Sequence, residues 1–254
     1  MNQQPEINTE LASLLESVIR DSIDDAAVIR FDKHHPQQLA VVYIYCTLIE
    51  LAHCELVLLE NEGVTALSVV FRSIFEAYSD FLAALNDVDY HKKMYATLLV
   101  EHIRFLRNVT KSPTRSIFVD VAANLNVDER LKRLEEELKR YKNDNHKPLS
   151  TSDRFKAGGL EHEYQSVYWL LCLEGHNNIS ALESRHIEKS GEEFGVALFK
   201  ATNHTDILRV LDSLIALIIV SGIKVHEFMN TGLTHKYETH QKNLDSIRAS
   251  YQKS

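Results

Sequence analysis

The chain has 254 residues, 44% of them apolar, which is enough to bury one continuous core. Only 8 Gly and 4 Pro occur, far fewer than the many turns of an all-β protein would need. The formal net charge of −8 argues against a large surface for polyanions, because phosphate binding relies on clustered Lys and Arg. We therefore predict an all-α fold, a single-domain bundle of about seven or eight helices over residues 1–254.

The first 110 residues predict four helices with clear breaks between them. Asn8 or Thr9 can cap the first helix, and Pro36 suits the first turn of the second. Gly63 separates the second helix from the third. The predicted helices cover about 8–29, 36–61, 64–85 and 88–109.

The third of these helices has the clearest pattern in the chain, with apolar side chains at steps of three and four. They are Leu67, Val70, Phe71, Ile74, Phe75, Tyr78, Phe81 and Leu82. In the fourth helix the side chains expected to face inward are Tyr95, Leu98, Leu99, Ile103 and Leu106. Both patterns predict continuous amphipathic helices.

Residues 128–147 predict a charged helical arm followed by a loop. Leu131, Leu134, Leu138 and Tyr141 follow the spacing of a coiled-coil seam, and four acid-to-base pairs at i,i+4 flank them. Such a helix is either a solvated surface helix with one apolar stripe or an arm that pairs with a second copy of the chain.

The remaining segments alternate between loops and short elements. We predict a short helix over 114–125, a loop over 142–159, helices over 161–174 and 179–184, and a small β-hairpin over 185–199. A long helix over 205–229 follows, and 235–254 forms a polar C-terminal helix or a frayed tail.

The sequence shows no pattern typical of a secretory signal peptide or of a membrane-spanning helix. The sequence MNQQPEINTE lacks the basic start and apolar run of a signal peptide, and the most apolar stretch, Ser213–Ile223, is too short to span a bilayer. Cys46, Cys54 and Cys172 are too few for a disulfide framework, and we expect all three to pack as small apolar residues. We expect a cytoplasmic protein with Ser213–Ile223 in a buried helix.

Arg72 and Glu76 are the first candidate site residues. They are four apart in the third helix, so they point the same way, and Glu76 lies nearly opposite the main apolar stripe. Their neighbours on that surface are small side chains such as Ser68 and Ser79. The pair is either an ordinary surface ion pair or a charged pair that faces a second helix or a cleft.

A second candidate group lies about 90 residues further along the chain. Tyr164, Tyr168, Cys172 and His176 are spaced four apart and form one polar-aromatic stripe on the predicted helix. His176 directly follows Gly175, where the helix should end and its side chain can turn towards a neighbour. Such a histidine is a base, a ligand or a plain hydrogen-bonding residue.

These two groups together carry a resemblance. Arg72-Ser-Ile-Phe-Glu76, followed by Tyr164-x3-Tyr168-x3-Cys172-x3-His176 and then Ser180, resembles bacterial domain-of-unknown-function family 5677 over roughly residues 40–225. Members of that family more often have Ser where this chain has Cys172. The resemblance implies an all-helical cytoplasmic fold and marks Arg72, Glu76 and His176, and it brings no established activity.

Two other patterns were compared with known helical sites. Helical HEPN ribonucleases have an Arg-polar-x3-His motif, and neither Arg30–His35 nor Arg107-Asn108 satisfies it, which leaves a diverged version built from Arg72 and His176. A di-iron bundle needs two Glu-x-x-His motifs. Glu50–His53 and Glu183–His186 match, at about the rate expected by chance from 13 His.

The sequence supports two functions. One is an interaction or regulatory module that works through a homodimer or a protein partner. The other is a HEPN-like RNA-cleaving or defence-related enzyme, with Arg72 on the phosphate, His176 as acid or base and Glu76 orienting Arg72. We treat Tyr164, Tyr168 and Cys172 as candidate binding residues. No phosphate-loop, dinucleotide or zinc motif occurs, so we expect no cofactor or metal.

Overall fold

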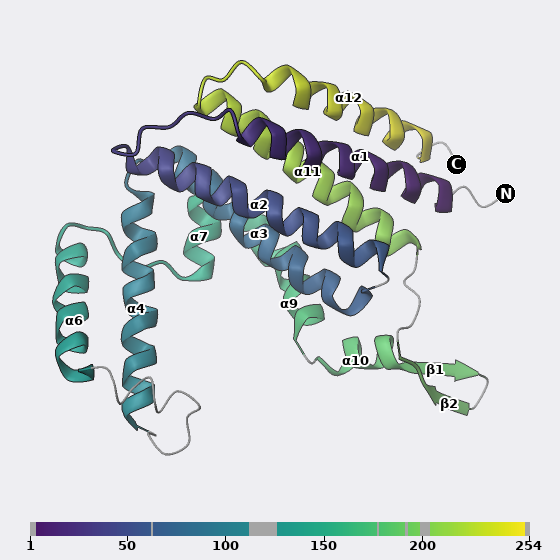
Figure 1. The fold of residues 1–254 in the computed structure, drawn as a ribbon. Helices are drawn as coiled ribbons and strands as arrows, with labels where there is room; N and C mark the ends of the chain where they lie inside the picture. The colour runs from purple at the N-terminus through teal and green to yellow at the C-terminus, as the bar shows by residue number, and fades with distance from the viewer. Residues whose placement is uncertain are drawn as a thin grey trace.

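The computed structural model describes residues 4–61, 63–111, 126–176, 178–190, 193–198 and 204–251. The described chain is almost wholly helical, with one small antiparallel hairpin, which confirms the predicted all-α class (Figure 1). The helices are α1 Gln4–Ala26, α2 Pro36–Glu60, α3 Val64–Asn86, α4 Tyr90–Lys111, α6 Val127–Asn143, α7 Thr151–Ala157, α8 Glu161–Glu163, α9 Trp169–Gly175, α10 Ile179–His186, α11 His204–Phe228 and α12 Thr234–Tyr251. A π-helical segment, Tyr164–Tyr168, joins α8 to α9, and the strands are β1 Ile187–Ser190 and β2 Glu193–Val196.

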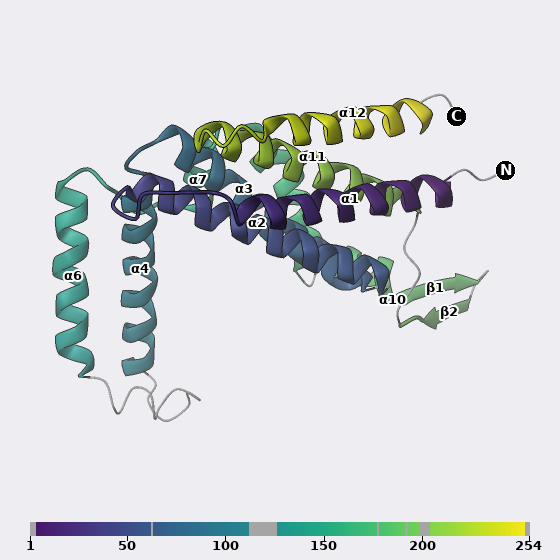
Figure 2. The same cartoon turned by 45° about the horizontal axis from the view of Figure 1, so that its top comes forward.

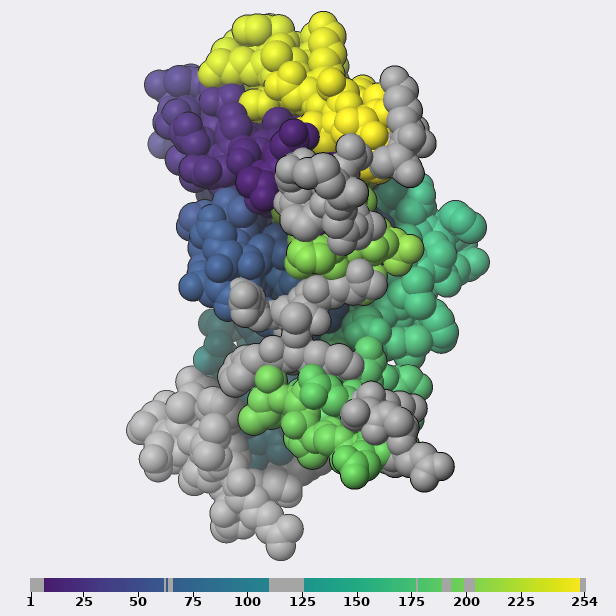
Figure 3. Space-filling view, turned by 90° about the vertical axis from the view of Figure 1, so that its right-hand side faces the viewer, coloured from purple at the N-terminus to yellow at the C-terminus, as the bar shows by residue number. Residues whose placement is uncertain are grey.

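Helices α1, α2, α3, α11 and α12 form the main bundle. Their apolar faces meet in one core, in which Leu15, Leu48, Ile74, Leu214 and Ile218 have no exposed surface. The stretch 213–223 lies inside α11, so the expected buried helix is confirmed. Both chain ends lie at one end of this bundle, where α1 and α12 pack together (Figure 3).

Within the described part of the chain, α2 is long and apolar enough to cross a membrane by length and composition. Half of its most apolar stretch is buried inside the protein. Contacts with α1, α3 and α11 cover these residues, so the apolar character of α2 serves the core of the bundle.

Helices α4 and α6 project from the bundle as a helical hairpin, which we call the arm (Figures 1 and 2). The arm has a small core of its own, made by Leu99, Ile103, Leu106 and Leu134. Two residues expected to face inward are more exposed than predicted, since Tyr95 is 40% exposed and Leu98 is 45% exposed. Tyr95 still contacts α6, because its ring centre lies 5.4 Å from that of Tyr141.

The ends of the bundle helices differ in detail from the predictions. The first helix begins at Gln4, and Asn8 does not cap it, because Asn8 is buried and donates to the carbonyl of His204 at 3.1 Å. The predicted start of α2 is correct, with Pro36 in the first turn and His35 as its cap. The C-terminal segment is a docked helix, α12, whose Tyr237 is fully buried.

The prediction of a loop over 142–159 is wrong in its second half, which contains α7. Ser150 and Asp153 form a reciprocal capping box, and Phe155 has no exposed surface. The capping box satisfies the first backbone N–H groups, and burial of Phe155 holds the short helix against α3. Polar composition concealed a helix that depends on these two features.

The hairpin prediction over 185–199 is confirmed in kind, with Ile187 opposite Val196 and Ser190 opposite Glu193. Its first two residues, Arg185 and His186, belong instead to α10. The predicted short helix over 114–125 lies outside the described residues. Of the cysteines, which are all free, Cys54 is exposed, so the expectation that all three pack as apolar residues is wrong for that one.

Candidate functional site

Helix α3 carries the first residues of the candidate site, because one of its sides packs in the main core and the other contacts α7 and α9. The apolar side enters the main core, where Ile74 and Phe81 are fully buried. The opposite side carries Arg72, Glu76 and Asp80, each four residues from the next, and we call these three the α3 polar row. Helices α7 and α9 pack against α3.

At one end of the α3 polar row, Arg72 meets His176. Arg72 Nη1 lies 3.3 Å from His176 Nε2, although the two residues are 104 positions apart in the chain. His176 is the residue at which α9 ends, and its backbone leaves the helical conformation there. Arg72 can only donate, so a hydrogen bond here needs His176 Nε2 as its acceptor. Nε2 accepts only in the neutral ring that carries its proton on Nδ1.

The access of solvent to this end is uneven. His176 is exposed, while the Arg72 side chain keeps 23% of its surface accessible. Arg72 Nε is buried and has no hydrogen-bond partner within the described structure; the nearest carboxylate oxygen, Glu76 Oε1, is 3.8 Å away. Because Nε itself is enclosed by protein, a ligand beside the exposed imidazole could reach Arg72 only through the rest of its side chain.

Glu76, in the middle of the row, is held by two other elements. The Tyr168 hydroxyl donates to Glu76 Oε1 at 2.7 Å, and Arg154 Nη1 of α7 lies 3.6 Å from Glu76 Oε2. Burial raises the pKa of Tyr168, and its hydrogen bond to the Glu76 carboxylate raises it further. Tyr168 thus stays protonated and acts as a fixed donor that orients Glu76.

The inner end of the row is a partly buried ion pair, in which Asp80 is buried and Arg154 keeps 26% of its side-chain surface accessible. Arg154 donates through Nε to Asp80 Oδ1 at 2.8 Å and through Nη2 to the second carboxylate oxygen, and the Tyr90 hydroxyl donates to Asp80 Oδ1 at 2.6 Å. Burial, followed by the charge of Asp80, raises the pKa of Tyr90. Burial alone would lower the pKa of Arg154, but its bonds to Asp80 outweigh this and raise it. The row is thus anchored in the core and reaches solvent at His176.

The π-helical segment positions the aromatic side chains beside the row. Tyr164 and Tyr168 stack with ring centres 5.3 Å apart, and both rings contact Phe155 of α7. A π turn is wider than an α turn, and such turns recur at functional sites. Cys172, half-buried and free, lies close enough to Tyr168 to raise the pKa of that phenol as well.

The sequence therefore singled out residues that the fold does bring together. Arg72, Glu76, Tyr168 and His176 form one continuous group, with Tyr164 and Cys172 beside Tyr168. The charged pair faces a second helix, the alternative that the sequence left open against a plain surface ion pair. Ser180 lies apart from this contact, exposed in the first turn of α10.

Three members of the network were missed. Asp80 continues the i,i+4 series after Glu76, so its spacing could have indicated it. Arg154 lies in the segment that was predicted as a loop, and the Ser150-x-x-Asp153 capping pattern was the available sign of a helix there. Tyr90 comes from the start of α4, and no local pattern links it to Asp80.

The competing patterns have structural partners elsewhere. Arg30 donates to the carbonyls of Ala27 and Ile29, and His35 caps α2, so this pair takes part in the turn between α1 and α2. Among the residues that the structure describes, no three His, Cys, Asp or Glu side chains group as metal ligands would, those of the two Glu-x-x-His motifs included.

Comparison with known families agrees with the resemblance seen in the sequence. Residues 38–194 match the model of a family described as "Family of unknown function (DUF5677)", which is more than half of the chain. This chain belongs to that family. The DUF5677 region contains Arg72, Glu76, Asp80, Arg154 and His176, so the whole row and its partners lie inside it. It ends earlier than the expected residue 225, within β2.

No curated protein and no solved structure matches the chain. The DUF5677 membership therefore brings no activity with it. What the site does must be argued from its own geometry.

Proposed function

We propose that this protein is a HEPN-like RNA-cleaving enzyme that uses Arg72 and His176. The observation that supports the proposal is their contact: the partly exposed Arg72 lies 3.3 Å from the exposed His176, where α9 ends against α3. An enzyme of this type requires the two side chains to reach one phosphodiester together. Had they been far apart, the idea would have had no basis.

The two side chains have complementary roles in this reaction. Arg72 donates to the non-bridging oxygens of the phosphate, where negative charge develops. When Arg72 Nη1 turns from His176 Nε2 to the phosphate, the lone pair of Nε2 is released, and it accepts the proton of the adjacent 2′-hydroxyl as the 2′-oxygen attacks phosphorus. The bond from phosphorus to the 5′-oxygen breaks, and that oxygen takes a proton from solvent. The products carry a 2′,3′-cyclic phosphate and a 5′-hydroxyl.

Glu76 and Tyr168 are positioning residues in this scheme. Glu76 is fixed by the Tyr168 hydroxyl at 2.7 Å and by Arg154, so it offers Arg72 a stationary negative charge. That charge holds the guanidinium at the end of the row facing His176. Tyr164 and Cys172 flank Tyr168, and we assign them the wall against which a nucleotide packs.

The test is cleavage of an end-labelled single-stranded RNA, with a DNA of the same sequence as a second substrate. The full chain should cut the RNA and leave the DNA intact, because DNA has no 2′-hydroxyl. His176→Ala should lower the rate by about 100-fold or more, the usual contribution of a general base. His34→Ala, at an exposed histidine before α2, is the matched control and should keep the full rate.

Two results would contradict the proposal. One is RNA that remains uncut by the folded wild-type chain, with folding verified by circular dichroism. The other is cleavage that persists unchanged in His176→Ala, since the activity would then come from another site.

A second candidate function is an interaction module that pairs with a copy of itself through the arm. The observation in its favour is a pair of exposed apolar side chains about one turn apart on α4, Tyr95 and Leu98, which are 40% and 45% exposed. Light scattering of the full chain should then give a dimer mass, and Leu98→Glu should return it to a monomer. A monomer at every concentration would exclude this function.

A further inference from the structure

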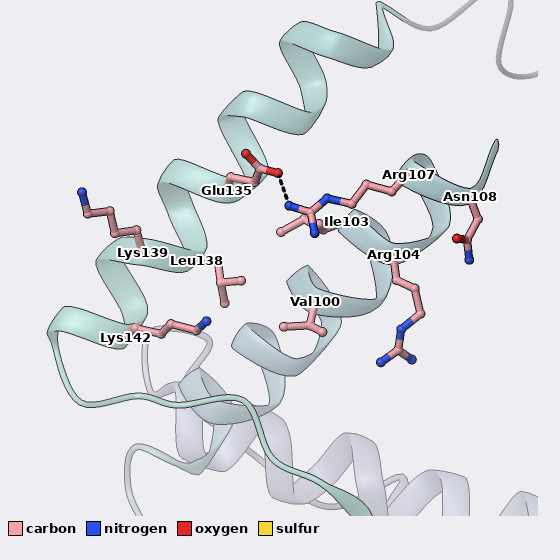
Figure 4. Close-up of a pocket in the computed structure, with 9 residues that line it drawn as sticks. All are labelled: Val100, Ile103, Arg104, Arg107, Asn108, Glu135, Leu138, Lys139 and Lys142. Carbon is pink, nitrogen blue, oxygen red and sulfur yellow. Dashed lines mark hydrogen bonds and ion pairs between the residues drawn. The ribbon is translucent and has the colours of Figure 1, made fainter. Parts of the chain in front are cut away.

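The arm contains a groove between α4 and α6, shown in Figure 4. Its volume is about 580 Å³, within the usual range for small-molecule sites. Val100, Ile103 and Leu138 form its apolar floor. Its polar lining consists of Arg104, Arg107, Asn108, Glu135, Lys139 and Lys142.

Charge is distributed very unevenly between the arm and the rest of the molecule. Helices α4 and α6 together contain eleven Lys and Arg against six Asp and Glu, whereas the whole chain has a net charge of −8. The rest of the protein is therefore strongly acidic. A positive surface on an acidic protein concentrates anions at one place and repels them elsewhere.

Inside the groove the positive charge exceeds the negative. Glu135 is the sole carboxylate among the lining residues, and Arg107 Nη2 binds it at 2.6 Å. Arg104 binds Glu101, which lies outside the lining. Lys142 extends across the groove towards α4, while Lys139 turns outward in Figure 4. With Glu101 counted, four cations stand against two carboxylates, and Lys142 is the cation that points into the groove in Figure 4.

The residue types favour phosphate over other anions. The lining contains two guanidinium groups and Asn108, and guanidinium groups match phosphate oxygens in pairs. The charged side chains are largely exposed, with Arg104 64% and Arg107 56% accessible, so a ligand in the groove can reach them. Two excess positive charges, one of them on Lys142 inside the groove, suit a ligand that carries phosphate.

We propose that this groove is a binding site for the phosphate groups of a nucleotide or of an RNA strand. The site is separate from the Arg72–His176 pair, because it is built from the arm alone and has its own core beneath it. It goes beyond the proposed function and does not depend on cleavage. Both ligands share the phosphate chemistry, and the source is decided by experiment.

The experiment measures binding to the full-length His176→Ala chain, so that an RNA probe is not consumed. The probes are ATP, inorganic tripolyphosphate and a fluorescein-labelled 12-nucleotide RNA, at low and at physiological salt. Arg104→Gln with Lys142→Gln removes two charges at exposed positions and should weaken binding at least tenfold at low salt. Arg20→Gln with Lys242→Gln removes two exposed charges elsewhere and should change binding less than twofold.

Each outcome has a definite meaning. If the groove variant no longer binds ATP or tripolyphosphate, the proposal is supported and the ligand is a small phosphate compound. If the groove variant loses binding of the RNA alone, the proposal is supported and the ligand is an RNA strand. No binding of any probe at low salt overturns the proposal, and so does equal weakening in the control variant. A chain that binds through the groove but cleaves nothing would refute the proposed function and leave this site standing.

Discussion

Glu55 is a carboxylic acid buried within the core side of α2. It has no exposed surface, and neither of its carboxylate oxygens has a hydrogen-bond partner among the described residues. Burial raises its pKa from 4.5 to about 8, because no nearby charge compensates the lost hydration. The folded protein therefore holds Glu55 protonated at neutral pH, while the unfolded chain ionises it.

This difference makes stability fall as pH rises between about 4.5 and 8. In that range the folded state binds one more proton than the unfolded state, so the free energy of unfolding decreases by up to about 1.4 kcal/mol per pH unit. Below this range Glu55 is neutral in both states, so it causes no loss of stability. Above the range Glu55 is ionised in both states, and the full cost of burying its charge destabilises the folded protein.

Replacing Glu55 by Met should remove this pH dependence. We expect Glu55→Met to be more stable than the wild type, and the gain should be several kcal/mol larger at pH 8.5 than at pH 5. Each pH unit in this range contributes up to about 1.4 kcal/mol. Urea unfolding at the two pH values measures it. Glu50→Met, at an exposed position on the same helix, is the control. An equal effect of Glu55→Met at both pH values would contradict the explanation.

At the scale of elements, α11 and α12 cross closely at Gly222. A Cβ at that position would lie 2.2 Å from two atoms of the Tyr237 ring, and Tyr237 is fully buried. The ring is also fixed through its hydroxyl, which lies 3.1 Å from that of Tyr45 and 3.3 Å from His226 Nε2. The crossing therefore depends on the absence of a side chain.

Gly222→Ala should destabilise the protein by about 3 kcal/mol, the upper range for an overpacked core. The sign is informative, because alanine in place of glycine within an unconstrained helix would stabilise by up to about 1 kcal/mol. Thermal unfolding measures the change. Gly195→Ala, in β2 with only a contact at 4.0 Å, should leave the melting temperature almost unchanged. A gain in stability for Gly222→Ala would disprove the close crossing.

The same scale shows what local sequence can and cannot predict. The face shared by Arg72 and Glu76 follows from their spacing, and the end of α9 at His176 follows from Gly175 before it. Which element covers that face does not follow, because α7 depends on tertiary packing of Phe155 as much as on its own cap. The π turn at Tyr164–Tyr168 was also hidden, since spacing of four residues reads equally well as a regular α-helix.

At the scale of the whole molecule, the described residues form two hydrophobic cores of unequal size. The main core joins five long helices, and the satellite core holds α4 to α6 in the arm. Apolar periodicity predicts each helix of the arm separately. It does not predict that α4 and α6 pack against each other, because that is a tertiary contact between segments distant in the sequence. The candidate enzyme site belongs to the bundle and the phosphate groove belongs to the arm.

The shared position of the chain ends has a practical consequence. Residues near both termini emerge where α1 and α12 meet, and the arm projects at the opposite end of the bundle (Figure 1). A protein tethered to a solid support by either extremity would therefore hold α4 and α6 out into the surrounding liquid. Immobilised in that way, it would present its positively charged projection to a passing anion unobstructed.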